Sequence, residues 1–415
     1  MSQASAYAAA LAGLPGMGPA GLVRILSRHD PESAWQVVLA GRIERPSRDR
    51  GRGLLGPTAQ SARTSWSERA HRIEPTAWWS PLAQRGVGVT WWGSRDYPAV
   101  LLNDPQPPGV LFWLGNPEVL ERPAVAIVGT RNATPDGRAV AYELGRDLAA
   151  AGICVVSGLA LGIDGAAHAG SLKAIEDGAP GAAVGVAASG VDVPYPRRHV
   201  RLWAQMAAAG LILSENLPGR PAQAWRFPSR NRVIAGLVRM VVVVESHAKG
   251  GSLITAEAAL ERGVEVRVVP GPVRSPASAG SNQLLYDGPG PVRSAQDVLD
   301  ALGIAAPARR PGWPDRSAPA GAGPSVSSGP SGPSGPSSAD VGSVASGAPE
   351  PAEIDETPDQ GCAASVLEAL GWRPASIGQL MLRSGLDAAR VGRALDHLRA
   401  ERIVAEDAGW WVRMR

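Results

Sequence analysis

The chain has 415 residues, of which 44% are hydrophobic, enough for two or three domains that each bury a core. Two cysteines exclude a disulfide framework or a cysteine-based metal cluster, and a formal net charge of +3 permits a polyanionic partner without requiring one. No apolar run approaches the roughly 20 residues of a membrane span and the first residues lack the basic start of a secretion signal, so we expect a cytoplasmic protein without membrane contact.

Residues 1–75 are expected to form a helical domain of the helix–hairpin–helix or SAM-like type. The run LAGLPGMGPAGLVRIL, residues 11–26, places apolar residues on both sides of a glycine-rich turn. The amides of Gly16 and Gly18 could meet a DNA phosphate there as an accessory contact, or the hairpin could serve packing alone. The sequence leaves both alternatives open.

Residues 76–303 are expected to form an α/β domain with an extended Rossmann-like, doubly wound and mostly parallel sheet. The Trp-rich runs at 77–79 and 90–93 are interpreted as connecting segments. From residue 124 onward, apolar β-rich runs alternate with stretches of helical spacing, a rhythm typical of parallel strand–helix–strand units. The runs are AVAIVG 124–129, ICVVSG 153–158, AAVGVAASG 182–190, LILSEN 211–216, MVVVVES 240–246 and VEVRVVPG 264–271.

Because ligands of such sheets bind beyond the carboxyl ends of the strands, the loops after the strands are the candidate site. After the first run, Gly129, Thr130 and Arg131 combine a tight turn, a hydroxyl and a charge, and the helix start behind them favours an anion. After the second run, Ser157 and Gly158 again offer donors.

In the same second loop, Asp164 and His168 lie four residues apart and could share a helix face. We favour helix capping for the aspartate and local packing for the histidine over a metal or acid–base role, because no third ligand or nucleophile accompanies them.

Arg197 and Arg198 follow the third run at an expected helix start, where their charge opposes the helix dipole unless an anionic ligand is present. After the fifth run, Gly250 and Gly251 expose backbone donors and Ser252 adds a hydroxyl. These residues are typical of a phosphate-binding loop, although they do not form a Walker A motif.

The fourth run is followed by WRFPSRNRVIAGL, residues 225–237, with three arginines in one short stretch. We expect Ser229 to cap a helix that puts Arg230, Asn231 and Arg232 in its first turn, and the strain of that charge to be relieved by a phosphate chain. Phe227 could stack on a base or pack in the core.

Residues 304–360 are dominated by Pro, Gly, Ser and Ala, a composition typical of a disordered linker. Residues 361–415 resemble a winged helix. Because the expected recognition helix carries acidic as well as basic residues, we favour an auxiliary or partner role over specific DNA reading.

Several motifs together resemble the DNA-processing protein A family, DprA, also called Smf. The resemblance is close over about residues 96–303. It rests on the runs VAIVGTR, SGLALGID, FPSRNRVIAGL, KGGSLITAEAALERG and VVPGPVRSPASAGSNQLL, which occur in the family's order and spacing.

The resemblance implies a single-stranded DNA-binding protein that acts without sequence readout. Such a protein protects incoming DNA in natural transformation and competence and helps load the RecA recombinase; the family is typically dimeric. It further implies phosphate contacts by Arg131, by Arg197 or Arg198, and by Arg230 and Arg232, with donors from Gly251 and Ser252. No catalytic residue, metal or cofactor is expected.

One rival hypothesis is an enzyme, a nucleoside-monophosphate phosphoribohydrolase of the LOG type, whose G-G-x-G-T-x-x-E signature is partly matched at 250–257. Leu253 and Ile254 replace the Gly-Thr pair that would contact phosphate, which favours a binding protein. A sequence-specific regulator acting through the winged helix is a third hypothesis, but it leaves the donors in the loops unexplained.

Overall fold

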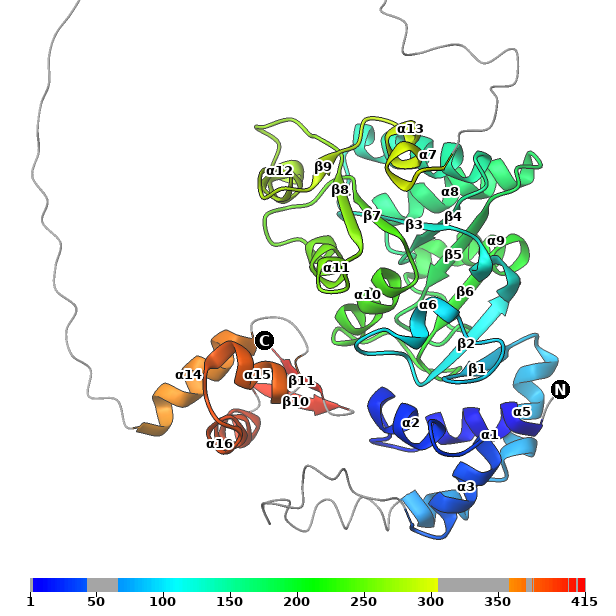
Figure 1. Ribbon diagram of the computed structural model, residues 1–415, viewed down its shortest axis with the longest axis vertical. Helices are drawn as coiled ribbons and strands as arrows, with labels where there is room; N and C mark the ends of the chain where they lie inside the picture. Colours follow the sequence, from blue (N-terminus) through cyan, green and yellow to red (C-terminus); the bar gives the residue numbers. More distant parts are fainter. Residues whose placement is uncertain are drawn as a thin grey trace, which may run out of the picture.

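The computed structural model describes residues 3–42, 66–304, 358–370, 375, 377–401, 403–407 and 410–414. Its centre is a nine-stranded sheet in the order β1-β2-β6-β5-β4-β3-β7-β8-β9 (Figure 1). The strands are β1 (Gly88–Trp91), β2 (Val110–Gly115), β3 (Ala124–Val128), β4 (Cys154–Ser157), β5 (Ala182–Val186), β6 (Leu211–Ser214), β7 (Met240–Val243), β8 (Glu265–Val268) and β9 (Gly290–Pro291).

The strands from β6 to β9 in this order are parallel, which confirms the predicted doubly wound sheet. All six predicted apolar runs are strands, because a parallel strand buried on both faces is apolar throughout. The sequence does not predict β1 and β2, which extend the sheet as antiparallel strands beside β6. Each of these strands is short and contains one tryptophan. The interpretation of the Trp-rich runs as connecting segments is wrong, because residues 77–79 lie in a helix, Pro75–Gln84, and residues 90–91 lie in β1.

Helices cover both faces of the sheet. One face packs against α7 (Pro135–Ala150), α8 (Ile163–Glu176), α9 (Val200–Ala209) and α13 (Ala295–Leu302). The other packs against α6 (Ala99–Leu102), α10 (Arg226–Gly236), α11 (Gly251–Leu260) and α12 (Ala279–Tyr286). The chain winds outward from β3 through β4, β5 and β6 and then returns to β7, so the switch point lies between β3 and β7.

The N-terminal helices pack at the β1 edge of the sheet (Figure 1). They are α1 (Gln3–Ala12), α2 (Pro19–Leu26), α3 (Pro31–Leu39) and α5 (Pro75–Gln84). Leu14 and Met17, which flank the hairpin turn, are buried in the core that these helices share with β1 and β2. The hairpin therefore has a packing role, and the accessory DNA contact stays a prediction.

The C-terminal module has its own core, centred on Val366, Leu395 and Trp411. It consists of α14 (Pro358–Leu370), α15 (Ile377–Ser384), α16 (Ala388–Ala400) and the hairpin of β10 (Val404–Asp407) with β11 (Trp410–Arg413). This arrangement confirms the predicted winged helix. The predicted linker, 304–360, lies almost wholly outside the described residues, and the predicted domain boundaries stay predictions.

Candidate nucleic-acid interface

An arginine and two aromatic rings meet beyond the carboxyl edge of the sheet. The Arg131 guanidinium lies over the Phe227 ring, 4.7 Å from its centroid, and the Tyr195 ring centroid is 5.5 Å from that of Phe227. Arg131 follows β3, Tyr195 lies in the loop after β5, and Phe227 is in the first turn of α10. Arg131 is exposed and Tyr195 is 43% exposed, so this Arg131–Phe227–Tyr195 cluster presents a cation and aromatic surface to solvent.

Further positive charge lies in the neighbouring segments. Arg197 and Arg198 are exposed in the short helix η3 (Arg197–His199), two and three residues after Tyr195. His199, at the end of η3, contacts the carbonyl of Leu159 through Nδ1 at 3.1 Å, which ties this turn to the loop after β4. Lys249 is exposed just before the start of α11.

The start of α11 is an open helix end. Gly250 is its N-cap without a side-chain cap, and its first turn carries no acidic residue. Gly251 is exposed, while the Ser252 hydroxyl is buried and donates to Ser246 Oγ at 2.9 Å. The backbone donors of this turn fit the predicted phosphate-binding loop, and the Ser252 hydroxyl serves the interior.

The start of α7 is closed by a carboxylate of the protein itself. Glu245 Oε2 accepts a hydrogen bond from Thr134 N–H at 3.0 Å, and the Glu245 carbonyl accepts one from Thr130 N–H at 2.7 Å. Thr130 is buried, and a Cβ at Gly129 would collide with Ile163. The sequence predicts an anionic ligand at this helix end, and the Glu245 carboxylate occupies that place instead. Gly129 and Thr130 shape the turn from which Arg131 projects.

The loop after β4 is also occupied internally. The Ser157 hydroxyl donates to the Ile127 carbonyl at 2.6 Å, and Gly158 N–H donates to Asp164 Oδ2 at 3.1 Å. Asp164 also accepts from Ala160 N–H at 3.4 Å. The predicted capping role is wrong, because the N-cap of α8 is Gly162, without a side-chain cap, and Asp164 binds amides of the preceding loop instead. Both donors predicted here for DNA are engaged inside the protein.

The arginines of the fourth loop are placed differently from the prediction. The helix α10 begins at Arg226 rather than after Ser229, whose hydroxyl donates to the Trp225 carbonyl instead of capping. Arg230 and Arg232 therefore follow the first turn and are buried, at 7% and 6% exposure. The expected strain at the helix start does not arise, because both guanidinium groups have partners in the interior.

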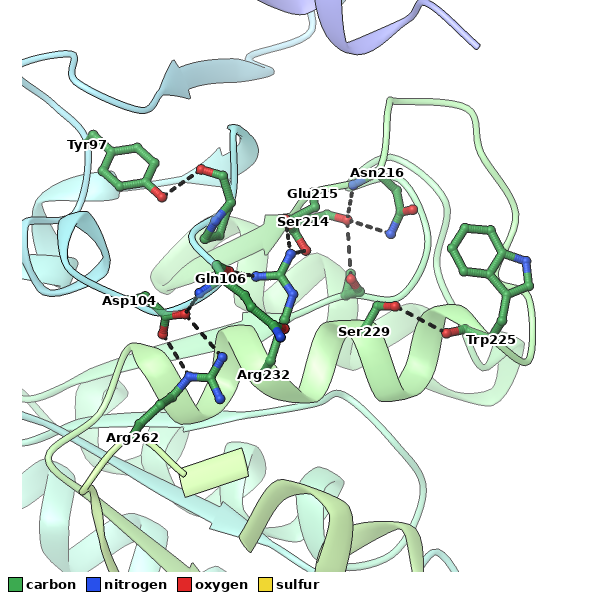
Figure 2. A network of polar contacts seen from close by, with 12 residues as sticks. Tyr97, Asp104, Gln106, Ser214, Glu215, Asn216, Trp225, Ser229, Arg232 and Arg262 are labelled. Carbon is green, nitrogen blue, oxygen red and sulfur yellow. Dashed lines mark hydrogen bonds and ion pairs between the residues drawn. The ribbon is translucent and has the colours of Figure 1, made fainter. Parts of the chain in front are cut away.

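Arg232 belongs to a network that joins α10 to the segment before β2 (Figure 2). Its guanidinium donates to Glu215 Oε2 at 2.6 Å and to the Gln106 carbonyl. Arg262 pairs with Asp104 at 2.7 Å, and Asp104 also accepts from Gln106 N–H at 2.7 Å. This network anchors α10 against the sheet.

Asn231, between the two arginines, is buried as well. Its amide donates to the Gly251 carbonyl at 3.3 Å, and its Oδ1 accepts from Arg230 Nε at 3.1 Å. Asn231 thereby sets α10 beside the open start of α11, a positioning contact that the sequence alone did not reveal.

Tyr195, Lys249 and Glu245 are the residues that sequence reasoning missed. Tyr195 precedes a predicted arginine pair by two residues and Lys249 precedes a predicted glycine, so position along the loops was an available signal. Glu245 had none, because its partner Thr134 lies 111 residues away.

No described residues form a group of three or more His, Cys, Asp or Glu that could hold a metal ion. Likewise, none of the helices in the described part of the chain is long and apolar enough to span a membrane.

The fold and the cluster define an extended Rossmann-like protein with a cationic and aromatic surface at the carboxyl edge of its sheet. The chain belongs to the DNA recombination-mediator protein A family, which residues 88–303 match. Residues 348–398 match the DprA winged helix domain.

Several known proteins are similar to this chain. The chain is 40% identical to the DNA processing protein DprA of Bacillus subtilis over 220 residues, which are 53% of this chain and 72% of the relative. The X-ray structure of DprA from Streptococcus pneumoniae is similar with a TM-score of 0.56 and 31% identity, over 72% of this chain and 98% of that one. A structure of DNA processing protein A from Helicobacter pylori, described for its single-stranded DNA binding mode, has a TM-score of 0.46 and 28% identity over 52% of this chain and 95% of that one.

Proposed function

We propose that this chain binds single-stranded DNA along the Arg131–Phe227–Tyr195 cluster without reading its sequence. The observation that carries the proposal is the exposed cation over an aromatic ring at the switch point of the sheet. Aromatic rings accept any unstacked base, and flanking cations hold the phosphates, a combination typical of proteins that bind single strands non-specifically.

The path of the DNA strand follows from which hydrogen-bond donors and cations are exposed to solvent. Arg131, Arg197, Arg198 and Lys249 are exposed, and the first turn of α11 has neither an acidic residue nor a side-chain cap. The starts of α7 and α8 have Glu245 and Asp164. We therefore assign the phosphates to the surface from η3 across Phe227 to Gly251.

The wider role is part of the same proposal. Membership of a recombination-mediator family supports protection of incoming single strands and loading of RecA recombinase during natural transformation, by a homodimer in the cytoplasm. The proposal describes a binding protein rather than an enzyme. Release of adenine from AMP by the purified protein would instead favour the phosphoribohydrolase.

The test is binding of a fluorescent oligo-dT and of a duplex of equal length, measured by anisotropy across a salt series. We expect preference for the single strand and a log–log salt slope of about 0.7 per phosphate contacted. Arg131→Ala should weaken binding to every sequence alike and lower the slope.

Arg122→Ala is the matched control, because Arg122 is exposed at the opposite end of the same strand β3. Equal affinity for the duplex, or the same loss from Arg122→Ala as from Arg131→Ala, would contradict the proposal.

A further inference from the structure

Arg230 lies beneath the surface on which the strand is proposed to bind. Its Nη1 donates to the Val186 carbonyl at 2.6 Å and to the Gly158 carbonyl, and its Nε donates to Asn231 at 3.1 Å. With 7% exposure, the side chain presents almost none of its surface to solvent. The Nη1 and Nε donors of this guanidinium are therefore directed into the interior of the protein.

The two carbonyls belong to neighbouring parallel strands. Val186 is the last residue of β5 and Gly158 directly follows β4. A side chain from α10 therefore joins the carboxyl ends of two strands at the edge where the ligand is expected. A Cβ at Gly158 would collide with the guanidinium, so this close approach requires glycine.

Gly158 also connects the buried cation to a buried anion. Its carbonyl accepts from Arg230 while its N–H donates to Asp164 Oδ2 at 3.1 Å. Burial lowers the pKa of Arg230 to about 10, and the negative charge of Asp164 opposes that shift. Burying a cation is costly, so an arginine kept here is expected to serve a purpose besides packing.

The contacts of Arg230 reach three parts of the proposed DNA surface. Arg230 is one turn after Phe227 on α10, and Val186 leads into the loop that carries Tyr195. Gly158 is followed by Leu159, whose carbonyl is contacted by His199, the last residue of η3. Arg230 thereby connects the helix of Phe227 with the loop of Tyr195 and with the turn of Arg197 and Arg198.

We propose that Arg230 is a positioning residue, which holds the Phe227 helix and the Tyr195 loop together and does not contact DNA. This inference rests on the proposed function, because it assigns a role within the same binding surface. It differs from the role that the resemblance implies, in which Arg230 binds phosphate.

Chemical modification of the unaltered protein tests the absence of contact. Phenylglyoxal modifies accessible arginines, and the modified positions can be mapped by mass spectrometry with and without oligo-dT. We expect Arg131, Arg197 and Arg198 to react and to be protected by the oligonucleotide, and Arg230 to remain unmodified in both samples. Modification of Arg230 in the free protein with protection by DNA would overturn the inference.

Two substitutions test the positioning role. Arg230→Gln and Arg230→Lys should each lower oligo-dT affinity on the order of tenfold, because both variants lose the guanidinium hydrogen bonds to the two carbonyls. The salt slope should stay that of the unaltered protein, because no phosphate contact is lost. Arg131→Gln should lower the slope by about 0.7. A lowered slope in Arg230→Gln with normal binding by Arg230→Lys, or unchanged affinity in both, would overturn the inference.

Hydrogen exchange separates positioning from general destabilisation. In Arg230→Lys we expect faster amide exchange in the loops 158–162 and 187–199 and unchanged exchange in the middle of α7. Faster exchange throughout the domain, or none in these loops, would contradict a positioning role. If the unaltered protein failed to bind oligo-dT, the proposed function would be wrong. The exchange experiment would still show whether Arg230 holds the loops 158–162 and 187–199 in place.

Discussion

Glu245 and Thr134 hold together the two loops that flank the switch point of the sheet. Glu245 follows β7 and accepts hydrogen bonds from the Thr134 N–H at 3.0 Å and from its hydroxyl at 2.6 Å. The same hydroxyl accepts from Gly137 N–H at 2.9 Å and so caps α7. The turn that presents Arg131 is therefore fixed from both sides.

Loss of the Thr134 cap of α7 should lower the free energy of unfolding by a measurable amount. Thr134→Ala removes the cap and one partner of a buried carboxylate, and should lower the free energy of unfolding by about 1–2 kcal/mol. Thr134→Ser keeps the hydroxyl and should stay much closer to the unaltered protein. Urea denaturation checks the pair, and equal losses in both variants would show that the methyl group matters rather than the hydrogen bonds.

Phe227 is expected to contribute stacking and no charge. Phe227→Ala should weaken single-strand binding by about 1–3 kcal/mol, the range for one base on an aromatic ring, with an unchanged salt slope. Phe227→Tyr keeps the ring and should bind nearly as well. Anisotropy titrations of both variants decide this, and a Phe227→Ala protein with full affinity would remove the ring from the binding surface.

The buried pair of Arg262 and Asp104 should matter far more for stability than an exposed pair. Their side chains are 6% and 4% exposed, so Arg262→Met leaves an uncompensated buried charge and should cost about 3–5 kcal/mol. The control is Arg293, whose side chain is 81% exposed where it pairs with the half-buried Asp297, and Arg293→Met should cost under about 1 kcal/mol. Similar losses in the two variants, measured by denaturation, would contradict the burial argument.

His168 should make the fold sensitive to acid. Burial lowers its pKa to about 3 from an ordinary value of 6.5, and the neighbouring His199 adds to that shift. The folded state thus disfavours the protonated ring, so its contribution to stability is complete above pH 6.5 and declines as the pH falls toward 3.

For this one group the slope is at most about 1.4 kcal/mol per pH unit. Unfolding free energies measured between neutral and mildly acidic pH should fall less steeply in His168→Leu. A pH profile for His168→Leu that runs parallel to that of the unaltered protein would disprove the assignment.

The central sheet could be predicted from the sequence because its pattern is local. Continuous apolar runs such as MVVVVES, residues 240–246, can form only strands buried on both faces when helices alternate with them. The antiparallel strands β1 and β2 were missed, since runs of only four and six residues show no clear alternation of apolar and polar side chains.

The arginines show why the site was harder to predict. Arg131 is exposed while Arg230 and Arg232 are buried, although all three occur in turn-like sequences rich in donors. Their placement depends on partners remote in sequence, such as the Gly158 carbonyl for Arg230, 72 residues away. Spacing along the chain therefore located the loops but not the direction of each side chain.

The order of the strands has a consequence for the newly made protein. β3 lies between β4 and β7, and β7 is made more than 100 residues after β3 during synthesis. Until residues 240–243 leave the ribosome, β3 lacks one of its two neighbouring strands. The sheet beneath the helix that carries Phe227 is then incomplete. Because domains fold as units, a nascent or truncated chain that ends before β7 should be unable to hold nucleic acid, and binding competence should arise only once the whole sheet has been translated.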